Sequence, residues 1–199
     1  MRIAISGSHS LGKSTVVRDW LNSNPDYLWE DEPYRALSLN GPYEIAFQDK
    51  STRLHNGLQL FYSISRVHRY SSMTDNVIFD RCPVDYLAYS QYTAETGKTD
   101  IDSDFVLSMV DAVRESLDHL DILAFVPSSI EWPVLIEEDG IRPLDVEYRD
   151  SVDLIFKKIY RENLYNLSPV FRNLKLIELI GDQTQRLHQI QEAIESFSS

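Results

Sequence analysis

The sequence predicts an α/β protein of three layers, with a five-stranded, mainly parallel sheet between two layers of helices. Short apolar runs typical of buried strands alternate with longer stretches of helical periodicity along the chain. A glycine-rich loop joins the first apolar run to the first helix. The chain has 199 residues, 43% of them hydrophobic, which suits one ordinary domain with a sizeable core. We therefore expect a single domain over residues 1–199.

The individual elements follow from apolar runs, periodicity and turn residues. Strands are expected at 3–5, 27–29, 77–79, 122–126 and 174–180. Helices are expected around 16–21 and at 52–73, 84–96, 102–120, 146–167 and 184–197. Pro83 stands where a helix tolerates proline, and Gly97 can end the same helix. The helix at 52–73 has one face formed by Leu54, Leu58, Phe61, Tyr62 and Ser65, and the segment 36–50 fits no single pattern.

The glycine-rich loop fits the pattern G-x-x-x-x-G-K-[ST], the phosphate-binding P-loop. It consists of Gly7, Ser8, His9, Ser10, Leu11, Gly12, Lys13, Ser14 and Thr15. Such a loop directs backbone N–H groups and the positive end of a helix toward a phosphate. Lys13 is then expected at the terminal phosphates of ATP, and Ser14 at Mg²⁺. The alternative is a glycine-rich turn without a ligand.

Composition and charge restrict the class of protein. With 19 basic and 31 acidic residues the net charge is −12, which disfavours nucleic acid and anionic membranes as partners. The single cysteine, Cys82, excludes an internal disulfide and a cysteine-rich zinc site. No apolar run approaches membrane-spanning length, and no signal peptide is evident, so we expect a cytoplasmic protein. A homodimer is compatible with the sequence, which does not specify the oligomer.

Asp80 and Arg81 follow an apolar strand, at the end where parallel sheets bind ligands. A second strand of P-loop proteins commonly presents an Asp that holds Mg²⁺, and Asp80 is our candidate for that role. Arg81 is a candidate to clamp a phosphate or the acceptor. Alternatively, Asp80 caps the next helix and Arg81 is a solvated charge.

Glu32 and Arg35 follow the second expected strand and are candidates for binding the substrate. A carboxylate at this position can accept a proton from a substrate hydroxyl or bind a ribose. Arg35 can pair with that carboxylate or with a substrate phosphate. The alternative is a charged surface turn, because Glu30, Asp31 and Glu32 are consecutive.

Arg142 and Arg149 form the last candidate group, in an irregular loop and the helix after it. Phosphoryl transfer needs charge neutralisation with water excluded, which arginines on a closing lid supply. Both are therefore candidate catalytic residues on an arginine-bearing lid. The alternative is a pair of surface arginines.

Four segments together resemble a known group of proteins: GSHSLGKST, WEDEPYR, IFDRCPVDYLAY and EDGIRPLDVEYR. They look like the nicotinamide-riboside-kinase-like branch of P-loop kinases, which includes many AAA-type ATPases. The resemblance covers nearly the whole chain in order, although its match at WEDEPYR is loose. It implies a P-loop NTPase fold, ATP and Mg²⁺ bound by Lys13 and Ser14, Asp80 near the metal or acceptor, and Arg142 in a lid. The Asp80-Arg81 pair is also similar to that of deoxynucleoside and thymidylate kinases.

These observations favour an ATP- and Mg²⁺-dependent phosphotransferase acting on a nucleoside- or nucleotide-like small molecule. The second hypothesis is a P-loop ATPase that acts as a regulatory switch without a small-molecule acceptor. A third is a kinase of a base in polymeric DNA, which the net charge of −12 disfavours. A second polar cavity between Arg81, Glu32 and the lid distinguishes the first hypothesis from the second.

Overall fold

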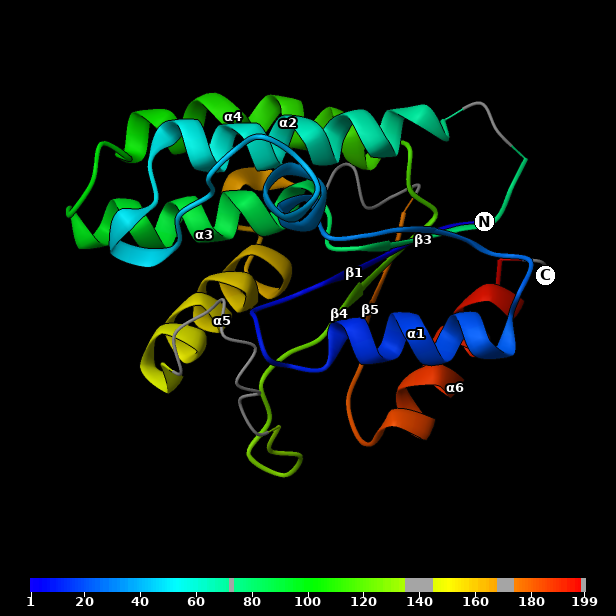
Figure 1. Ribbon diagram of the computed structural model, residues 1–199. Coiled ribbons are helices and arrows are strands. Elements are labelled where there is room, and N and C mark those ends of the chain that lie inside the picture. The colour runs from blue at the N-terminus through cyan, green and yellow to red at the C-terminus, as the bar shows by residue number, and fades with distance from the viewer. Residues whose placement is uncertain (72–73, 135–144, 168–173, 198–199) are drawn as a thin grey trace.

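The computed structural model describes residues 1–71, 74–134, 145–167 and 174–197, which form a central sheet with helices on both faces (Figure 1). The strands are β1 (Arg2–Ser6), β2 (Leu28–Glu30), β3 (Val77–Asp80), β4 (Ile122–Phe125) and β5 (Lys175–Glu178). The α-helices are α1 (Lys13–Ser23), α2 (Arg53–Arg69), α3 (Pro83–Thr96), α4 (Ser103–Leu117), α5 (Val146–Arg161) and α6 (Gln183–Glu195). Shorter helical turns lie at η1 (Arg35–Leu39), η2 (Gln48–Lys50) and η3 (Leu164–Asn166).

The sheet has the strand order β2-β3-β1-β4-β5, and all of its pairings are parallel. This confirms the predicted three-layer α/β fold with five parallel strands. The order reverses at β1, which lies between β3 and β4, and such a point is where parallel sheets bind ligands. Ile5 near the end of β1 is in register with Asp80 at the end of β3. The loop after β1 therefore begins beside Asp80.

The core lies in two layers because neighbouring strand residues face opposite sides of the sheet. Ile3, Ile5 and Ile78 pack with α1 and α6 on one face. Ala4 and Phe79 pack with helices α2 to α5 on the other face. Figure 1 shows α1 and α6 below the sheet, α2, α3 and α4 above it, and α5 at the left of the strands.

Two helices end earlier than their periodicity predicts. The helix expected at 52–73 ends at Arg69, and the one expected at 146–167 ends at Arg161. After α5, Asn163 and Tyr165 have φ angles of 59° and 69°, in the left-handed region. Apolar residues continue at helical spacing there, but a backbone with positive φ cannot continue a right-handed helix.

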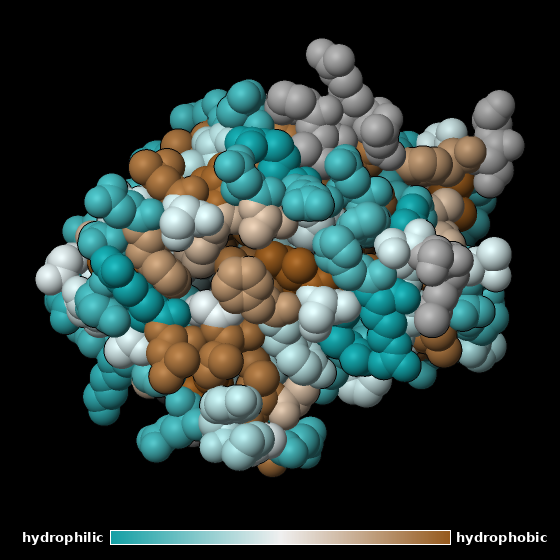
Figure 2. Space-filling view, turned by 90° about the horizontal axis from the view of Figure 1, so that it is seen from above, coloured by the Kyte–Doolittle hydropathy of each residue, from teal (hydrophilic) through white to brown (hydrophobic). Residues whose placement is uncertain are grey.

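The face of α2 that the periodicity singled out is not its buried face. Leu54 and Phe61 are 65% and 62% exposed. Its buried residues are instead Asn56, Gln59, Leu60, Ser63 and Val67. Figure 2 looks onto this side of the molecule, where apolar residues form several groups separated by polar ones. This buried face is partly polar because Asn56 and Gln59 line a cavity beside α2.

None of the helices in the described ranges is both long and apolar enough to cross a lipid bilayer.

Candidate active site

The P-loop connects β1 to α1, as its sequence context predicts. Gly7 has a φ of 139°, and a Cβ atom there would lie 2.6 Å from the Val126 carbonyl oxygen. Gly12 has a φ of 82° and is the residue before α1. Both glycines are therefore required by backbone geometry, one of them by close packing against the end of β4 as well.

Lys13, Ser14 and Asp80 meet at the start of α1. The Ser14 hydroxyl donates a hydrogen bond of 2.6 Å to Asp80 Oδ2, and the Lys13 amino group donates to the Ser8 carbonyl oxygen. Asp80 does not cap the following helix, because Cys82 is the N-cap of α3. A hydroxyl beside one carboxylate suits Mg²⁺, which takes one or two protein oxygens and completes its shell with phosphates and water.

Burial changes the protonation of both charged groups. Lys13 is 5% exposed, and burial together with the neighbouring Arg81 lowers its pKa from 10.5 to about 7. Burial, with the nearby Glu32 charge, raises the pKa of Asp80. Both shifts disfavour the charged forms, and a bound polyphosphate with its cation would favour them again.

A large cavity opens in front of these residues, and α6 contributes to it. Its lining consists of Ser10, Gly12, Lys13, Ser14, Thr15, Glu32, Arg35, Asp80, Arg81, Trp132, Pro133, Val134, Gly181, Asp182, Gln183 and Arg186. Arg186 is 5% exposed and donates a hydrogen bond of 2.8 Å to the Leu11 carbonyl oxygen in the P-loop. Sequence reasoning missed Trp132, Gln183 and Arg186. The signal for Gln183 and Arg186 is a polar turn, Gly181-Asp182, after the last strand.

Arg81 is held in a strained and fully packed position. Its φ is 80°, which is unusual for a residue other than glycine, and its side chain is 4% exposed. Its guanidinium donates to Glu32 Oε1 at 2.5 Å and to Asp85 Oδ1 at 3.0 Å. Burial opposes the charge, but Glu32 and other neighbouring groups raise the pKa of Arg81 well above its usual value. It is therefore no solvated charge, and such strain is typical of functional sites.

Asp85 was not singled out from the sequence, although its carboxylate accepts hydrogen bonds from the P-loop, Arg81 and the start of α3. Its side chain is fully buried, and Oδ2 accepts a hydrogen bond of 3.1 Å from the Cys82 backbone N–H at the start of α3. Oδ1 accepts from Arg81 and, at 3.4 Å, from the Gly7 backbone N–H. One carboxylate thus ties the P-loop, Arg81 and α3 together.

Glu32 and Arg81 also line a second cavity, on the side of the P-loop bordered by α2 and α3. The complete lining is His9, Glu32, Phe47, Gln48, Ser51, Asn56, Gln59, Arg81, Tyr86, Tyr89, Thr93 and Tyr148. Glu30 and Glu32 are 7% and 4% exposed, so their segment is no charged surface turn. Glu30 instead forms an ion pair with Arg66 of α2. Because Glu32 and Arg81 line both cavities, the two cavities meet at this pair.

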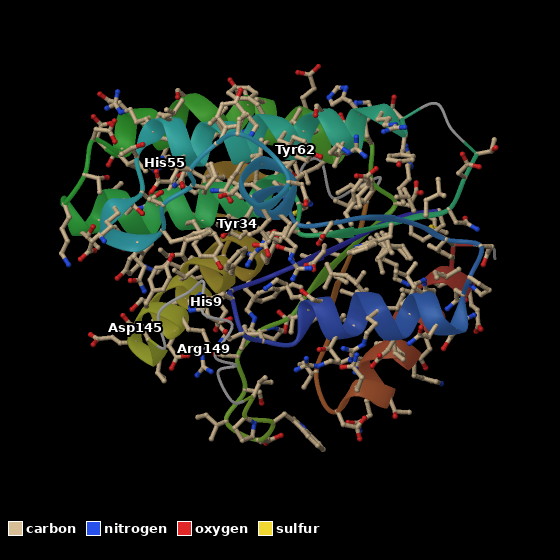
Figure 3. The ribbon with its side chains drawn as sticks, viewed as in Figure 1. His9, Tyr34, His55, Tyr62, Asp145 and Arg149 are labelled. Atoms are coloured by element: carbon tan, nitrogen blue, oxygen red, sulfur yellow. The ribbon has the colours of Figure 1, made fainter. Side chains whose placement is uncertain are left out.

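His9 belongs to this second cavity, although it is a P-loop residue. It is 1% exposed, and its ring stacks on Tyr148 of α5 with 4.8 Å between centroids. Figure 3 shows it between the P-loop and the first turn of α5, which begins after Asp145. The P-loop pattern leaves this position variable, so the motif by itself carried no signal for its role.

The predicted arginines occupy different places. Arg35 lines the first cavity and forms an ion pair of 3.2 Å with Asp31. Arg149 lies in the first turn of α5, where its guanidinium donates to the Val134 carbonyl oxygen at 3.0 Å and to Asp150 at 2.9 Å. Its own carbonyl oxygen accepts a hydrogen bond from Ser8 of the P-loop. It is not among the lining residues of either cavity. Arg142 lies outside the described residues.

Comparison with known proteins places this geometry in context. A family model described as an AAA domain matches residues 2–186. A search of curated proteins finds no match. The solved structure of NadR protein in complex with NR superposes with a TM-score of 0.68 at 16% sequence identity, covering 98% of this chain and 50% of that chain. The chain thus spans about half the length of NadR.

A second solved structure is similar over its whole length. Deoxyadenosine kinase from M. mycoides, with its products dCMP and dCDP bound, has a TM-score of 0.67 at 16% identity. The match covers 98% of this chain and 100% of the kinase. The same kinase with bound dATP has a TM-score of 0.65. The chain therefore belongs to the AAA domain family whose model it matches, and its fold is that of P-loop nucleoside kinases.

Proposed function

We propose that the protein is a kinase that transfers the terminal phosphoryl group of ATP, with Mg²⁺, to a small nucleoside- or nucleotide-like acceptor. The observation that carries this proposal is the meeting of two cavities at Glu32 and Arg81. One cavity contains the P-loop lysine and the pair formed by Ser14 and Asp80. The second cavity is lined by the same two charged residues, and a nucleotide-dependent switch would have no need of it.

Each residue at the junction has a role in this proposal. Lys13 would hold the terminal phosphates as a point charge, and Ser14 and Asp80 would hold the cation. When bound, Mg²⁺ supplies charge neutralisation at the phosphate oxygens. Glu32 reaches both cavities, so its carboxylate is placed to accept the proton of an acceptor hydroxyl. Arg81 would position Glu32 through their 2.5 Å contact and neutralise charge near the transferred group.

The lid arginines belong to the same proposal. Charge in phosphoryl transfer spreads over oxygens that a P-loop alone does not surround. Arg142, and Arg149 at the start of α5, would supply further positive charge there. The contact between Ser8 and the Arg149 carbonyl oxygen, at 2.9 Å, links α5 to the P-loop and so supports a role for this helix.

The test is a product assay with purified protein, ATP, Mg²⁺ and a panel of nucleosides and nucleoside monophosphates, read by mass spectrometry. We expect one class of acceptor to gain a phosphoryl group and Lys13→Ala to abolish the reaction. The same mixture without an acceptor measures ATP hydrolysis. Hydrolysis that no member of the panel changes, with no phosphorylated product, would favour the switch and refute the kinase.

A further inference from the structure

The second cavity contains two buried hydrogen-bond donors that have no partner among the described residues. One is the hydroxyl of Tyr86 on α3, a side chain that is 3% exposed. The other is the amide nitrogen Nε2 of Gln48 in η2. Both residues line the cavity, which they reach from different segments of the chain. Leaving such a group unpaired in a folded protein is destabilising, so two at one site call for an explanation.

Other polar side chains of the cavity have partners within the protein. The Asn56 side chain accepts from Ser51 at 2.7 Å and donates to Ser90 at 2.9 Å. Thr93 donates to the Tyr89 carbonyl oxygen at 3.0 Å. The folded chain thus satisfies this part of the cavity without a ligand, whereas Tyr86 and Gln48 stay unpaired. That contrast distinguishes groups that stabilise the fold from groups left for a bound molecule.

The chemistry of the two donors restricts what they bind. An amide nitrogen only donates hydrogen bonds. Burial raises the pKa of Tyr86 well above its usual value, so its hydroxyl keeps its proton and can donate. The Gln48 amide nitrogen therefore requires an acceptor on the bound molecule, such as a carbonyl oxygen or ring nitrogen, and the Tyr86 hydroxyl can donate to a second one. The aromatic rings of Phe47, Tyr89 and Tyr148 in the same lining suit a flat heterocycle.

The charges of the cavity argue against an anionic acceptor. Arg81 is the one Lys or Arg in the described lining, and its guanidinium already contacts the carboxylates of Glu32 and Asp85. A phosphate monoester would have to compete with both of these buried carboxylates. An acceptor that presents a neutral hydroxyl brings no second negative charge to these two carboxylates.

From these observations we infer that the acceptor is a nucleoside rather than a nucleoside monophosphate, and that Tyr86 and Gln48 determine its specificity by donating hydrogen bonds to its base. This inference rests on the proposed kinase function for the identity of the reaction, but the binding step can be measured without ATP.

The test uses the full chain and the variant Tyr86→Phe, which removes one hydroxyl and no ring. Because that hydroxyl has no protein partner, we expect the thermal unfolding temperature to stay the same or rise. For the preferred nucleoside we expect KM and the calorimetric Kd to rise about tenfold, as for one lost hydrogen bond, with kcat changed less than about twofold. Gln48→Glu, which replaces the donor by a carboxylate, should weaken binding in the same way.

Analogues of that nucleoside, each lacking one ring nitrogen or carbonyl oxygen, identify the partner of Tyr86. Removing the partnered atom should weaken binding to the wild type about tenfold and to Tyr86→Phe not at all. Tyr70→Phe is the matched control, since the Tyr70 hydroxyl donates to Glu30 outside both cavities. It should lower the unfolding temperature and leave KM unchanged.

The outcomes separate this inference from the proposed function. Turnover with a KM that Tyr86→Phe leaves unchanged would overturn the role of Tyr86 and keep the kinase. Preference for a monophosphate over its nucleoside would overturn the acceptor class. Nucleoside binding that Tyr86→Phe weakens, without any turnover, would support the inference and refute the kinase. If neither a nucleoside nor a monophosphate in the panel binds or reacts, both are wrong.

Discussion

The buried Lys13 should take up a proton when a nucleotide binds. Its pKa of about 7 in the free protein means that about a tenth of the molecules carry this charge at pH 8. The phosphates of a bound nucleotide would favour the charged form and return the pKa toward its usual value. We therefore expect uptake of about 0.9 proton per nucleotide at pH 8, and about half a proton at pH 7.

Isothermal titration calorimetry in buffers of different ionisation enthalpy measures this number directly, because the slope of binding enthalpy against ionisation enthalpy is the number of protons taken up. The titration uses nucleotide without metal, so that cation binding at Asp80 does not contribute. Lys13→Arg keeps its charge at this pH and should show no uptake. Asp80→Asn should show at least as much uptake as the wild type, because the Asp80 charge raises the pKa of Lys13. A binding enthalpy independent of the buffer at pH 8 would refute the reasoning.

The same lowered pKa affects stability in a defined direction. Between about pH 7 and pH 10.5 the unfolded chain binds more protons at Lys13 than the folded chain does, so the free energy of unfolding should rise with pH across this window. Below about pH 7 the full cost of the buried charge is present. Lys13→Met removes that cost, so the variant should be more stable than the wild type at pH 7, with a difference that disappears toward pH 10. Equilibrium urea unfolding over this pH range measures the difference, and a constant difference would contradict the assignment.

The remaining predictions concern single contacts of the site. Asp80→Asn should reduce Mg²⁺-dependent turnover more than nucleotide binding, because the amide keeps its size but loses the charge beside Ser14; a Mg²⁺ titration of the rate checks this. Glu32→Gln should lower kcat about 10²–10⁴-fold through loss of the proton acceptor, in steady-state assays at saturating acceptor; an unchanged kcat would exclude Glu32 as the base. Gly7→Ala should destabilise the protein by more than about 1 kcal/mol in thermal unfolding, since its Cβ would lie 2.6 Å from the Val126 carbonyl oxygen. Arg142→Ala should lower kcat with little change in nucleotide affinity. The double variant with Arg149→Ala should lose less activity than the sum of the two single losses in free energy. Fully additive losses would indicate that the two arginines act independently.

The sequence alone was sufficient for the features that depend on neighbouring residues. The apolar runs and the helical spacing predict the alternating order of strands and helices, and the parallel sheet follows from that order. The P-loop residues and the Asp80-Arg81 pair could be singled out because each follows directly after a strand, and parallel strands end at one edge of the sheet. Helix ends were predicted less well, because the left-handed backbone at Asn163 depends on conformation that apolar spacing does not encode.

Only the tertiary structure revealed the second cavity. Its lining comes from the P-loop, η2, α2, α3 and α5, through residues such as His9, Gln59 and Tyr148 that form no motif along the chain. The buried face of α2 includes Asn56 and Gln59, although a pattern of apolar residues predicts that such polar side chains lie on the surface. Likewise the contact of Arg81 with Glu32 joins residues 49 positions apart. The spacing of apolar residues predicts which side chains are buried in the core. This binding site instead consists largely of polar groups from distant segments, which come close together only when the chain has folded.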